Sequence, residues 1–315
     1  MTLALAIHGG CGTLPKTEMT EAEWAEARSD LAKALRAGWT ILSAGGPAVD
    51  AVEAAVREME DSAHFNAGHG AAFNTDGDHE LDASIMDGET LAAGAVCAAK
   101  RIRNPICAAK ALMKRGDPLL IAGPAADLFA EHEGLDIVAN DYFSTERRRK
   151  NLQSMRIREL VGNVAEASEA EKHGTVGAVA CDANGHLAAA TSTGGYTNKP
   201  AGRVGDSPII GAGTYARDGR CAVSGTGKGE YFIRYCVGHE IASLIAYQGL
   251  SLKDATDRAL AELTQHQIGA GLVAVGANGE IVAPYNTQGM YRGWVTPDGL
   301  VHVATHGDVE MAGQA

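Results

Sequence analysis

The chain has 315 residues, of which 45% are hydrophobic and 21% charged, and its formal net charge is 27 − 39 = −12 at pH 7. This length suits one large core or two modest ones. The acidic balance argues against nucleic acid or an anionic membrane as the main partner, and no apolar run approaches the roughly 20 residues of a membrane helix.

The first half of the chain predicts strands that alternate with helices. Residues 3–7 suit a buried first strand rather than a signal peptide, because the segment is short and has no basic leader. Thr20 and Glu23 form a capping box that predicts a helix to about residue 42, and a second helix fits residues 48–59. Strands are expected at 81–86 and 91–98, and Asn104-Pro105 predicts a helix through residue 114.

The second half predicts mainly strands. Residues 144–170 are charged and helix-prone, and we expect them to end in a mobile connection at about residues 161–174. A hairpin is predicted at 175–181 and 187–193. Further strands fit 209–213, 220–225, 271–275, 281–284, 289–294 and 300–304, and helices fit 230–248 and 252–266. Grouped strands flanked by helix pairs in both halves predict an α+β layered fold, not a doubly wound one.

The six cysteines show no CxxC spacing and mostly lie in apolar segments. We therefore expect buried, reduced thiols in a cytoplasmic protein, in preference to disulfides or a metal site.

Gly174 and Thr175 lie where the polar connection meets the first strand of the predicted hairpin. A threonine in this position is commonly structural. A threonine hydroxyl is a poor nucleophile unless a base lies within hydrogen-bond reach. If Thr175 became an N-terminal residue, its own α-amine, with a pKa of about 7.7–8.0, could be that base. A self-cleavage site between Gly174 and Thr175 would supply such an amine.

Two later segments suit the binding of a small zwitterion. Arg203 and Asp206 offer a cation for a carboxylate and an anion for an ammonium, or else they form a local surface salt bridge. Residues 225–230 join a strand to a helix, so backbone N–H groups there could stabilise an oxyanion. A Walker phosphate site is excluded because Gly229 follows Lys228 where serine or threonine is required.

Two motif matches lack their required context. Residues 211–216 fit the GxGxxA pattern for dinucleotides, but a turn into another strand is expected to follow instead of a helix. His239-Glu240 begins a zinc-protease motif, but Ser243 stands where the second histidine belongs.

Taken together, the motifs of this chain resemble the plant-type (type III) L-asparaginases, which are also isoaspartyl peptidases and N-terminal-nucleophile hydrolases. The resemblance covers nearly the whole chain. It rests on Ile7-His-Gly-Gly10, Phe65-Asn-Ala-Gly68, Glu80-Leu-Asp-Ala-Ser-Ile-Met-Asp-Gly88, Gly94-Ala-Val96, Arg103-Asn-Pro105, Gly174-Thr-Val-Gly177, Ala190-Thr-Ser-Thr-Gly-Gly195, Gly202-Arg-Val-Gly-Asp-Ser-Pro208, Gly225-Thr-Gly227, Gly229-Glu230 and Asn286-Thr-Gln-Gly-Met-Tyr291.

The resemblance implies a four-layer αββα sandwich that forms one domain. The chain would cut itself into an α chain, residues 1–174, and a β chain, residues 175–315, and two such αβ units would form a dimer. The implied reaction is hydrolysis of L-asparagine and β-aspartyl dipeptides to L-aspartate, with no cofactor for catalysis.

The resemblance also implies roles for individual residues. Thr175 would be the nucleophile and its freed amine the base, with Thr193 supporting the hydroxyl or the amine. Thr226 and the Gly227 N–H would form the oxyanion hole. The remaining implied residues are Arg203, Asp206 and Gly229 for the substrate head group, Asn66 as an anchor of Thr175, and Met59, Glu60, Ser62, Phe65, Ala67 and His69 as main-chain ligands of a structural sodium ion.

The departures from the family pattern are few. His69 occupies a position that is often aliphatic, which a main-chain ligand tolerates, and Lys228 lies near the expected leaving-group side. Within the superfamily, a glycosylasparaginase or a threonine aspartase is the alternative. Outside it, the alternatives are a nucleotide-dependent enzyme, and a non-catalytic binding protein for aspartyl compounds that keeps Arg203 and Asp206 but never breaks its chain.

Overall fold

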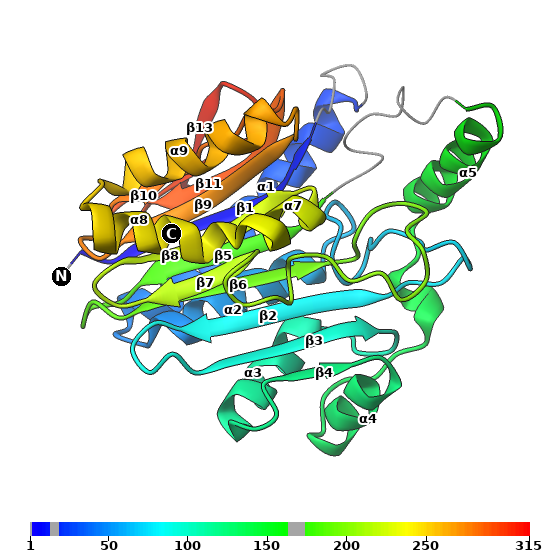
Figure 1. The fold of residues 1–315 in the computed structure, drawn as a ribbon, viewed down its shortest axis with the longest axis horizontal. Helices are drawn as coiled ribbons and strands as arrows, with labels where there is room; N and C mark the ends of the chain where they lie inside the picture. The colour runs from blue at the N-terminus through cyan, green and yellow to red at the C-terminus, as the bar shows by residue number, and fades with distance from the viewer. Residues whose placement is uncertain (1, 13–18, 163–173) are drawn as a thin grey trace.

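The computed structural model describes residues 2–12, 19–162 and 174–315. Two β-sheets are stacked face to face, and helices cover the outer face of each (Figure 1). One core cluster lies between the larger sheet and its helices. The other joins the facing sides of the two sheets to the helices that cover the smaller sheet. The layers therefore run helix, sheet, sheet, helix, which confirms the expected αββα sandwich.

The larger sheet has nine strands and combines segments from both ends of the chain. In spatial order the strands are β13 (Val309–Gln314), β12 (Leu300–Ala304), β11 (Gly289–Val295), β1 (Ala4–Gly12), β5 (Val176–Cys181), β6 (Leu187–Thr193), β2 (Leu81–Asp87), β3 (Ala93–Ala99) and β4 (Leu120–Ala122). Strand β1 pairs with β11 on one side and with β5 on the other. Strands from before and after residue 174 therefore interleave within one sheet.

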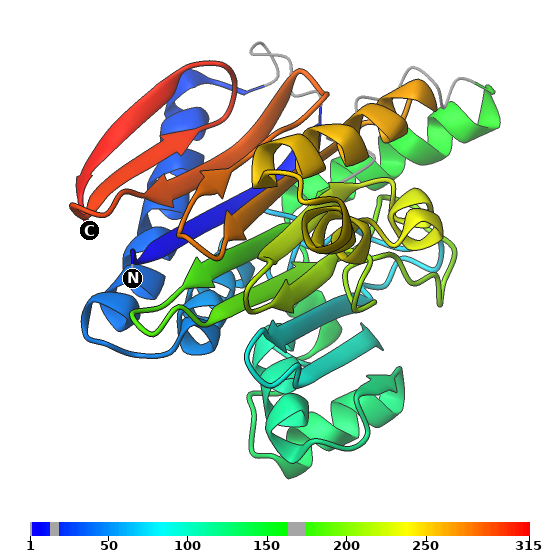
Figure 2. The same cartoon turned by 60° about the vertical axis from the view of Figure 1, so that its left-hand side comes forward.

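Helices cover the outer face of this sheet and flank its far end. They are α1 (Glu21–Ser43), α2 (Ala48–Glu60), α3 (Pro105–Arg115) and α4 (Pro124–His132). The 3-10 helix η1 (Asn140–Phe143) and α5 (Glu146–Leu160) follow. Helix α5 projects from one end of the sandwich in both views (Figures 1 and 2).

The smaller sheet has four strands, in the order β10 (Ile281–Val282), β9 (Ala270–Gly276), β8 (Cys221–Gly227) and β7 (Thr214–Arg217). Its outer layer contains α7 (Gly229–Tyr235), α8 (Val237–Gln248) and α9 (Leu252–Gln265). Figure 2 shows α8 and α9 on the side of the sandwich opposite α1.

Side chains that alternate between the two faces of each strand explain how the larger sheet contributes to both core clusters. Leu5 and Ile7 of β1 face the α1–α3 layer, whereas Ala4 and Ala6 face the second sheet. Successive side chains of a strand point to opposite faces, so a continuous apolar run is what a sheet covered on both sides requires.

Several local predictions are confirmed. Thr20 caps α1, with Glu23 N–H donating to its hydroxyl and the Glu23 carboxylate accepting from Thr20 N–H. Ser251 caps α9 in a similar way. Four of the six cysteines are buried as expected, whereas Cys107 is half-buried and Cys236 is exposed.

The predicted strand at 209–213 is wrong, because this segment is a turn. The Ala212 N–H donates to the Ile209 carbonyl, and Gly211 has a φ of +93°. The predicted single helix at 230–248 is also wrong. Cys236 adopts left-handed φ and ψ of 46° and 49°, and the first N–H groups of α8, from Gly238 and His239, donate to the carbonyls of Ala212 and Gly211. Because the start of α8 forms hydrogen bonds with this turn, α7 and α8 are two separate helices.

The described part of the chain also contains five elements that the sequence pattern did not reveal, namely β4, α4, η1, β7 and β13. The charged stretch after residue 144 is helical as far as Leu160. Most of the expected mobile connection, residues 163–173, lies outside the described residues. Among the described residues, no helix has the length and apolarity needed to span a membrane.

Candidate active site

Thr175 lies one residue before β5, and its side chain is buried between the two sheets. In the β5–β6 ladder, Val176 pairs with Ser192 and Gly177 with Thr191. Continuing this register places Thr175 opposite Thr193, the last residue of β6. Their hydroxyl oxygens lie 3.2 Å apart. The predicted hairpin thus brings the candidate nucleophile and its supporting hydroxyl together.

The carbonyl of Gly174 accepts three hydrogen bonds from side chains. The Thr175 Oγ1 hydroxyl donates at 2.7 Å, the Thr193 Oγ1 hydroxyl at 2.9 Å and the Asn66 amide Nδ2 at 2.9 Å. Donors that converge on a carbonyl oxygen stabilise the negative charge it acquires when a nucleophile attacks its carbon. The peptide bond between Gly174 and Thr175 is therefore polarised in the intact chain.

Asn66 is held rigidly in place. Its Nδ2 also donates to the Gly195 carbonyl at 2.6 Å, and its Oδ1 accepts from the Ala72 N–H at 2.6 Å. The Gly194 N–H donates to the Asn66 carbonyl. Asn66 thus bonds to Gly174, the residue before Thr175, and ties the loop before β2 to the end of β6.

Gly10 is required by the close approach of β1 to the candidate nucleophile. A Cβ atom at Gly10 would lie 3.1 Å from Thr175 N and 3.2 Å from Gly174 Cα, and its φ is +105°. A side chain here would be strained by the backbone and crowded against the Gly174–Thr175 bond.

Thr226 lies at the end of β8 and is linked to this region through the residue after Gly10. The Cys11 N–H donates to Thr226 Oγ1 at 3.3 Å, and the Cys11 thiol donates to the Thr226 carbonyl at 3.3 Å. Since Thr226 Oγ1 accepts this bond, its hydroxyl proton is available to another acceptor. Gly227 follows with a φ of +149°, a conformation that glycine adopts readily.

Arg203, Asp206 and Gly229 meet at one place. A Cβ atom at Gly229 would lie 2.8 Å from Asp206 Oδ1 and 3.0 Å from Arg203 Nη2. The acid partner of Arg203 is Glu230, at 3.0 Å from Nε and 2.9 Å from Nη2, and the guanidinium stacks over the Tyr196 ring. The alternative of a local Arg203–Asp206 surface salt bridge is therefore wrong.

Asp206 is a buried carboxylate whose Oδ2 finds no hydrogen-bond donor in the described structure. Burial raises the pKa of Asp206 to about 7, although the charge of Arg203 opposes the rise. The ionised form of a buried carboxylate without a donor is stabilised when a cationic group binds next to it.

A row of buried polar side chains, for which the sequence predicts no role, lies beneath the candidate nucleophile. His8, Thr191 and Ser84 occupy one row of the larger sheet, with Gly177 between His8 and Thr191. Thr214 and Ser224 form the matching row of the smaller sheet. All five side chains are fully buried.

Hydrogen bonds join these two rows across the sheet interface. Ser224 Oγ lies 3.0 Å from His8 Nε2 and 2.7 Å from Thr191 Oγ1, and Thr214 Oγ1 donates to Thr191 at 2.6 Å. Ser84 Oγ donates to the carbonyl of Ser207, the neighbour of Asp206. Burial lowers the pKa of His8 to about 3, so this imidazole is neutral and does not serve as a base near neutral pH.

The loop proposed to wrap a sodium ion fits the expected ligands in part. The carbonyls of Met59 and Glu60 already accept hydrogen bonds from Ser62 and His69 N–H groups. The other four expected carbonyls accept none from the described residues, and they belong to Ser62, Phe65, Ala67 and His69. Hard cations take oxygen ligands of this kind. No cluster of three or more His, Cys, Asp or Glu side chains in the described ranges is placed to hold a metal.

The same loop is fixed to β6 through a buried carboxyl group. Ser192 Oγ donates to Glu60 Oε1 at 2.6 Å, and the Ile106 N–H donates to the same oxygen. Burial raises the pKa of Glu60 to about 8. Glu60 therefore contributes a side chain that fixes the loop to the strand carrying Thr193, besides its expected main-chain role.

Both motif matches set aside from the sequence lack their context in the fold. Residues 211–216 pass from a turn into β7, with no helix after them. His239 lies on α8, with Ser243 Oγ 3.4 Å from its Nδ1.

Comparison with known proteins gives one consistent result. The model of the asparaginase family matches residues 1–305. The isoaspartyl peptidase of Salmonella typhimurium is 45% identical over 294 residues, covering 92% of this chain and 94% of that protein. The isoaspartyl peptidase of Escherichia coli is 45% identical over 297 residues, 92% of each. A probable isoaspartyl peptidase/L-asparaginase 2 of Arabidopsis thaliana is 38% identical over 322 residues, covering 96% of this chain and 98% of that protein.

Proposed function

The chain belongs to the asparaginase family, and from this premise we propose that it matures by cutting itself between Gly174 and Thr175 and then uses Thr175 as nucleophile. It is a hydrolase of the isoaspartyl peptidase and L-asparaginase type. The observation that carries the proposed maturation is the Gly174 carbonyl, which accepts bonds from Thr175, Thr193 and Asn66 at 2.7–2.9 Å.

The proposed self-cleavage is an N→O acyl shift, and this geometry supports it. Thr175 Oγ1 attacks the Gly174 carbonyl carbon, and Asn66 Nδ2 and Thr193 Oγ1 stabilise the resulting oxyanion. The C–N bond then breaks, the Thr175 nitrogen gains a proton, and an ester joins Gly174 to Thr175 Oγ1. Water hydrolyses this ester, which leaves a Gly174 carboxylate and a free α-amine on Thr175.

In substrate hydrolysis the free amine takes over as base. Arg203 would bind the α-carboxylate of the substrate and Asp206 its α-ammonium, with a Gly229 backbone group beside them. Thr175 Oγ1 attacks the side-chain carbonyl, whose oxygen would face the Thr226 hydroxyl and the Gly227 N–H. The α-ammonium of Thr175 then protonates the leaving nitrogen, and water hydrolyses the β-aspartyl ester.

The sheet order supports a stable pairing of the two fragments after cleavage. Strand β1, before residue 174, lies between β11 and β5, both after it. Separating the fragments would break three strand ladders, β1–β11, β1–β5 and β2–β6, and expose both cores. We therefore propose that residues 1–174 and 175–315 remain one domain.

Three finer features are also proposals. Two αβ units would form a dimer. A sodium ion would bind the main-chain oxygens of the loop at 59–69 and stiffen the segment that carries Asn66. A cytoplasmic location stays a prediction from the sequence.

The test of the proposed maturation is whether activity appears at the rate of cleavage. In freshly purified protein, the fraction cut before Thr175, measured by intact mass, should rise with the same rate constant as aspartate release from asparagine. Full turnover in uncut protein would contradict the proposed mechanism. A chain that binds aspartate but never cuts would instead favour the binding-protein alternative.

A second expectation concerns pH. The ratio of kcat/KM for asparagine to kcat/KM for succinamate should fall as the pH drops below about 7, the pKa to which burial raises Asp206. Asp206 binds the α-ammonium only when ionised, and its protonation below that pKa removes the charge. Succinamate has the same amide and carboxylate but no ammonium, so the ratio cancels the titration of the Thr175 amine. A constant ratio would show that Asp206 does not bind the ammonium.

A further inference from the structure

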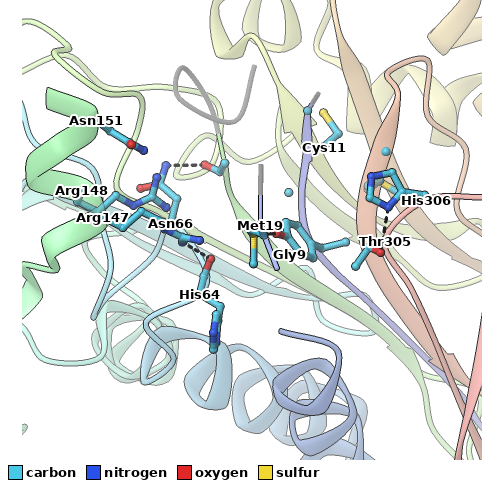
Figure 3. A pocket seen from close by; sticks show the side chains of 16 residues that line it. Gly9, Cys11, Met19, His64, Asn66, Arg147, Arg148, Asn151, Thr305 and His306 are labelled. Carbon is cyan, nitrogen blue, oxygen red and sulfur yellow. Dashed lines mark hydrogen bonds between the residues drawn. The ribbon is translucent and has the colours of Figure 1, made fainter. Parts of the chain in front are cut away.

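A cavity of about 190 Å³ opens beside Gly174, and neither Arg203 nor Asp206 lines it. Figure 3 shows Arg147, Arg148 and Asn151 entering it from α5 on one side, and Thr305 and His306 lying on the other. The end of β1 that contains Gly10 and Cys11 forms part of its wall.

The chemistry of the proposed reaction places the leaving group on this side. The leaving nitrogen must receive its proton from the Thr175 α-amine, so it must lie next to that nitrogen. In the intact chain Thr175 N is bonded to Gly174, which lines the cavity, and Gly10 approaches the same atom closely. A residue attached to the leaving nitrogen therefore extends into the cavity.

Arg148 is a buried cation without an acid partner in the described structure. Its Nε donates to the Gly70 carbonyl at 2.5 Å, and no described carboxylate pairs with the guanidinium. Burial, followed by repulsion from Arg147, lowers the pKa of Arg148 to about 9. By contrast, His64 in the same wall lies 2.8 Å from Asp30. In the described ranges, therefore, no carboxylate offsets the positive charge of Arg148 in this wall, which favours an anionic ligand.

We infer that this cavity receives the leaving residue of a β-aspartyl dipeptide and that Arg148 binds the free α-carboxylate of that residue. Arg147 adds positive charge at the same wall, where its Nη2 donates to the His64 carbonyl at 2.6 Å. This assignment rests on the proposed function. It also separates the two substrate types, because ammonia released from asparagine carries no group that reaches Arg148.

The first experiment compares substrates of the wild-type enzyme. We expect kcat/KM for a β-aspartyl dipeptide with a free carboxylate to exceed that for the same dipeptide as its C-terminal amide by roughly 10- to 100-fold, the usual value of a hydrogen bond to a charged group. Equal values for the two dipeptides would overturn the inference. Turnover of asparagine in the same preparation shows independently that the enzyme is mature.

The second experiment replaces the cation. In Arg148→Met, the ratio of kcat/KM for the free dipeptide to kcat/KM for asparagine should fall roughly 10- to 100-fold, and the preference over the amide should disappear. Arg156→Met is the matched control, since Arg156 is also on α5 and donates to a loop carbonyl, that of Thr75 at 2.7 Å, but lies outside the cavity wall. This control should keep both ratios.

Other outcomes for Arg148→Met are equally decisive. If the variant loses activity on all three substrates by the same factor, Arg148 only holds the loop at Gly70 and the inference is wrong. If the variant cannot be obtained folded, the wild-type comparison of free and amidated dipeptides decides alone.

Discussion

Thr175→Ala should remain a single chain of about 32.7 kDa and release no aspartate from asparagine or a β-aspartyl dipeptide. The substitution removes the hydroxyl that lies 2.7 Å from the Gly174 carbonyl oxygen and that belongs to the proposed nucleophile. Without it neither the acyl shift nor the acyl-enzyme can form, so the loss should reach the detection limit of both assays. Intact-mass spectrometry and aspartate release measure the two effects.

Thr175→Ser is the matched control for this variant. Serine keeps the hydroxyl and loses one methyl group, so it should still cut before position 175, though at a reduced rate because the hydroxyl is less restrained in its rotamer. Cleavage of Thr175→Ala at the same bond would show that another group performs the reaction and would remove Thr175 from the mechanism.

The parts of the site that depend on local pattern could be predicted from the sequence. Thr175 and Thr193 meet because they lie opposite each other at the open end of a hairpin whose turn and alternation are visible in the chain. The hairpin register then fixes which side chains face each other. The start of α1 was similarly predictable, because Thr20 and Glu23 satisfy each other's backbone.

The parts that depend on stacking of the two sheets could not be predicted from pattern. His8 and Ser224 are 216 residues apart and meet only because the two sheets pack face to face. Gly177 makes this possible, since a Cβ atom there would lie 1.9 Å from Ser224 Oγ and 2.5 Å from His8 Nε2. In the sequence, Gly177 and Ser224 fall within expected strands and His8 directly follows one, so nothing marks the three residues as a cluster.

The break between α7 and α8 has the same origin. Residues 230–248 contain one weak helix former, Gly238, which costs a helix only about 1 kcal/mol, and Cys236 is not a residue that favours a left-handed backbone. The break occurs because the start of α8 donates to carbonyls of a distant turn, at Gly211 and Ala212. The same rearrangement leaves α7 as a short helix that carries Gly229 and Glu230 to Arg203.

Arg203→Ala should abolish useful turnover of both substrates while self-cleavage continues. The guanidinium is held by Glu230 and Tyr196 next to Asp206, so it is already oriented before a substrate carboxylate arrives. Losing one partner of such a charge pair costs about 2–5 kcal/mol, or roughly 30- to 4,000-fold in kcat/KM. The scissile carbonyl of Gly174 is bound by Thr175, Thr193 and Asn66, and Arg203 makes none of these bonds.

Measuring both reactions in one preparation separates a binding role of Arg203 from a structural one. Arg203→Lys is the matched control, because lysine keeps the charge but lacks the planar fork that matches a carboxylate, so its activity should fall between the other two. If Arg203→Ala instead remains uncut, the bond to Glu230 is needed to assemble the Gly174–Thr175 region and Arg203 has a structural role. Continued self-cleavage with loss of turnover places Arg203 on the substrate, since the nucleophile must then have formed correctly without it.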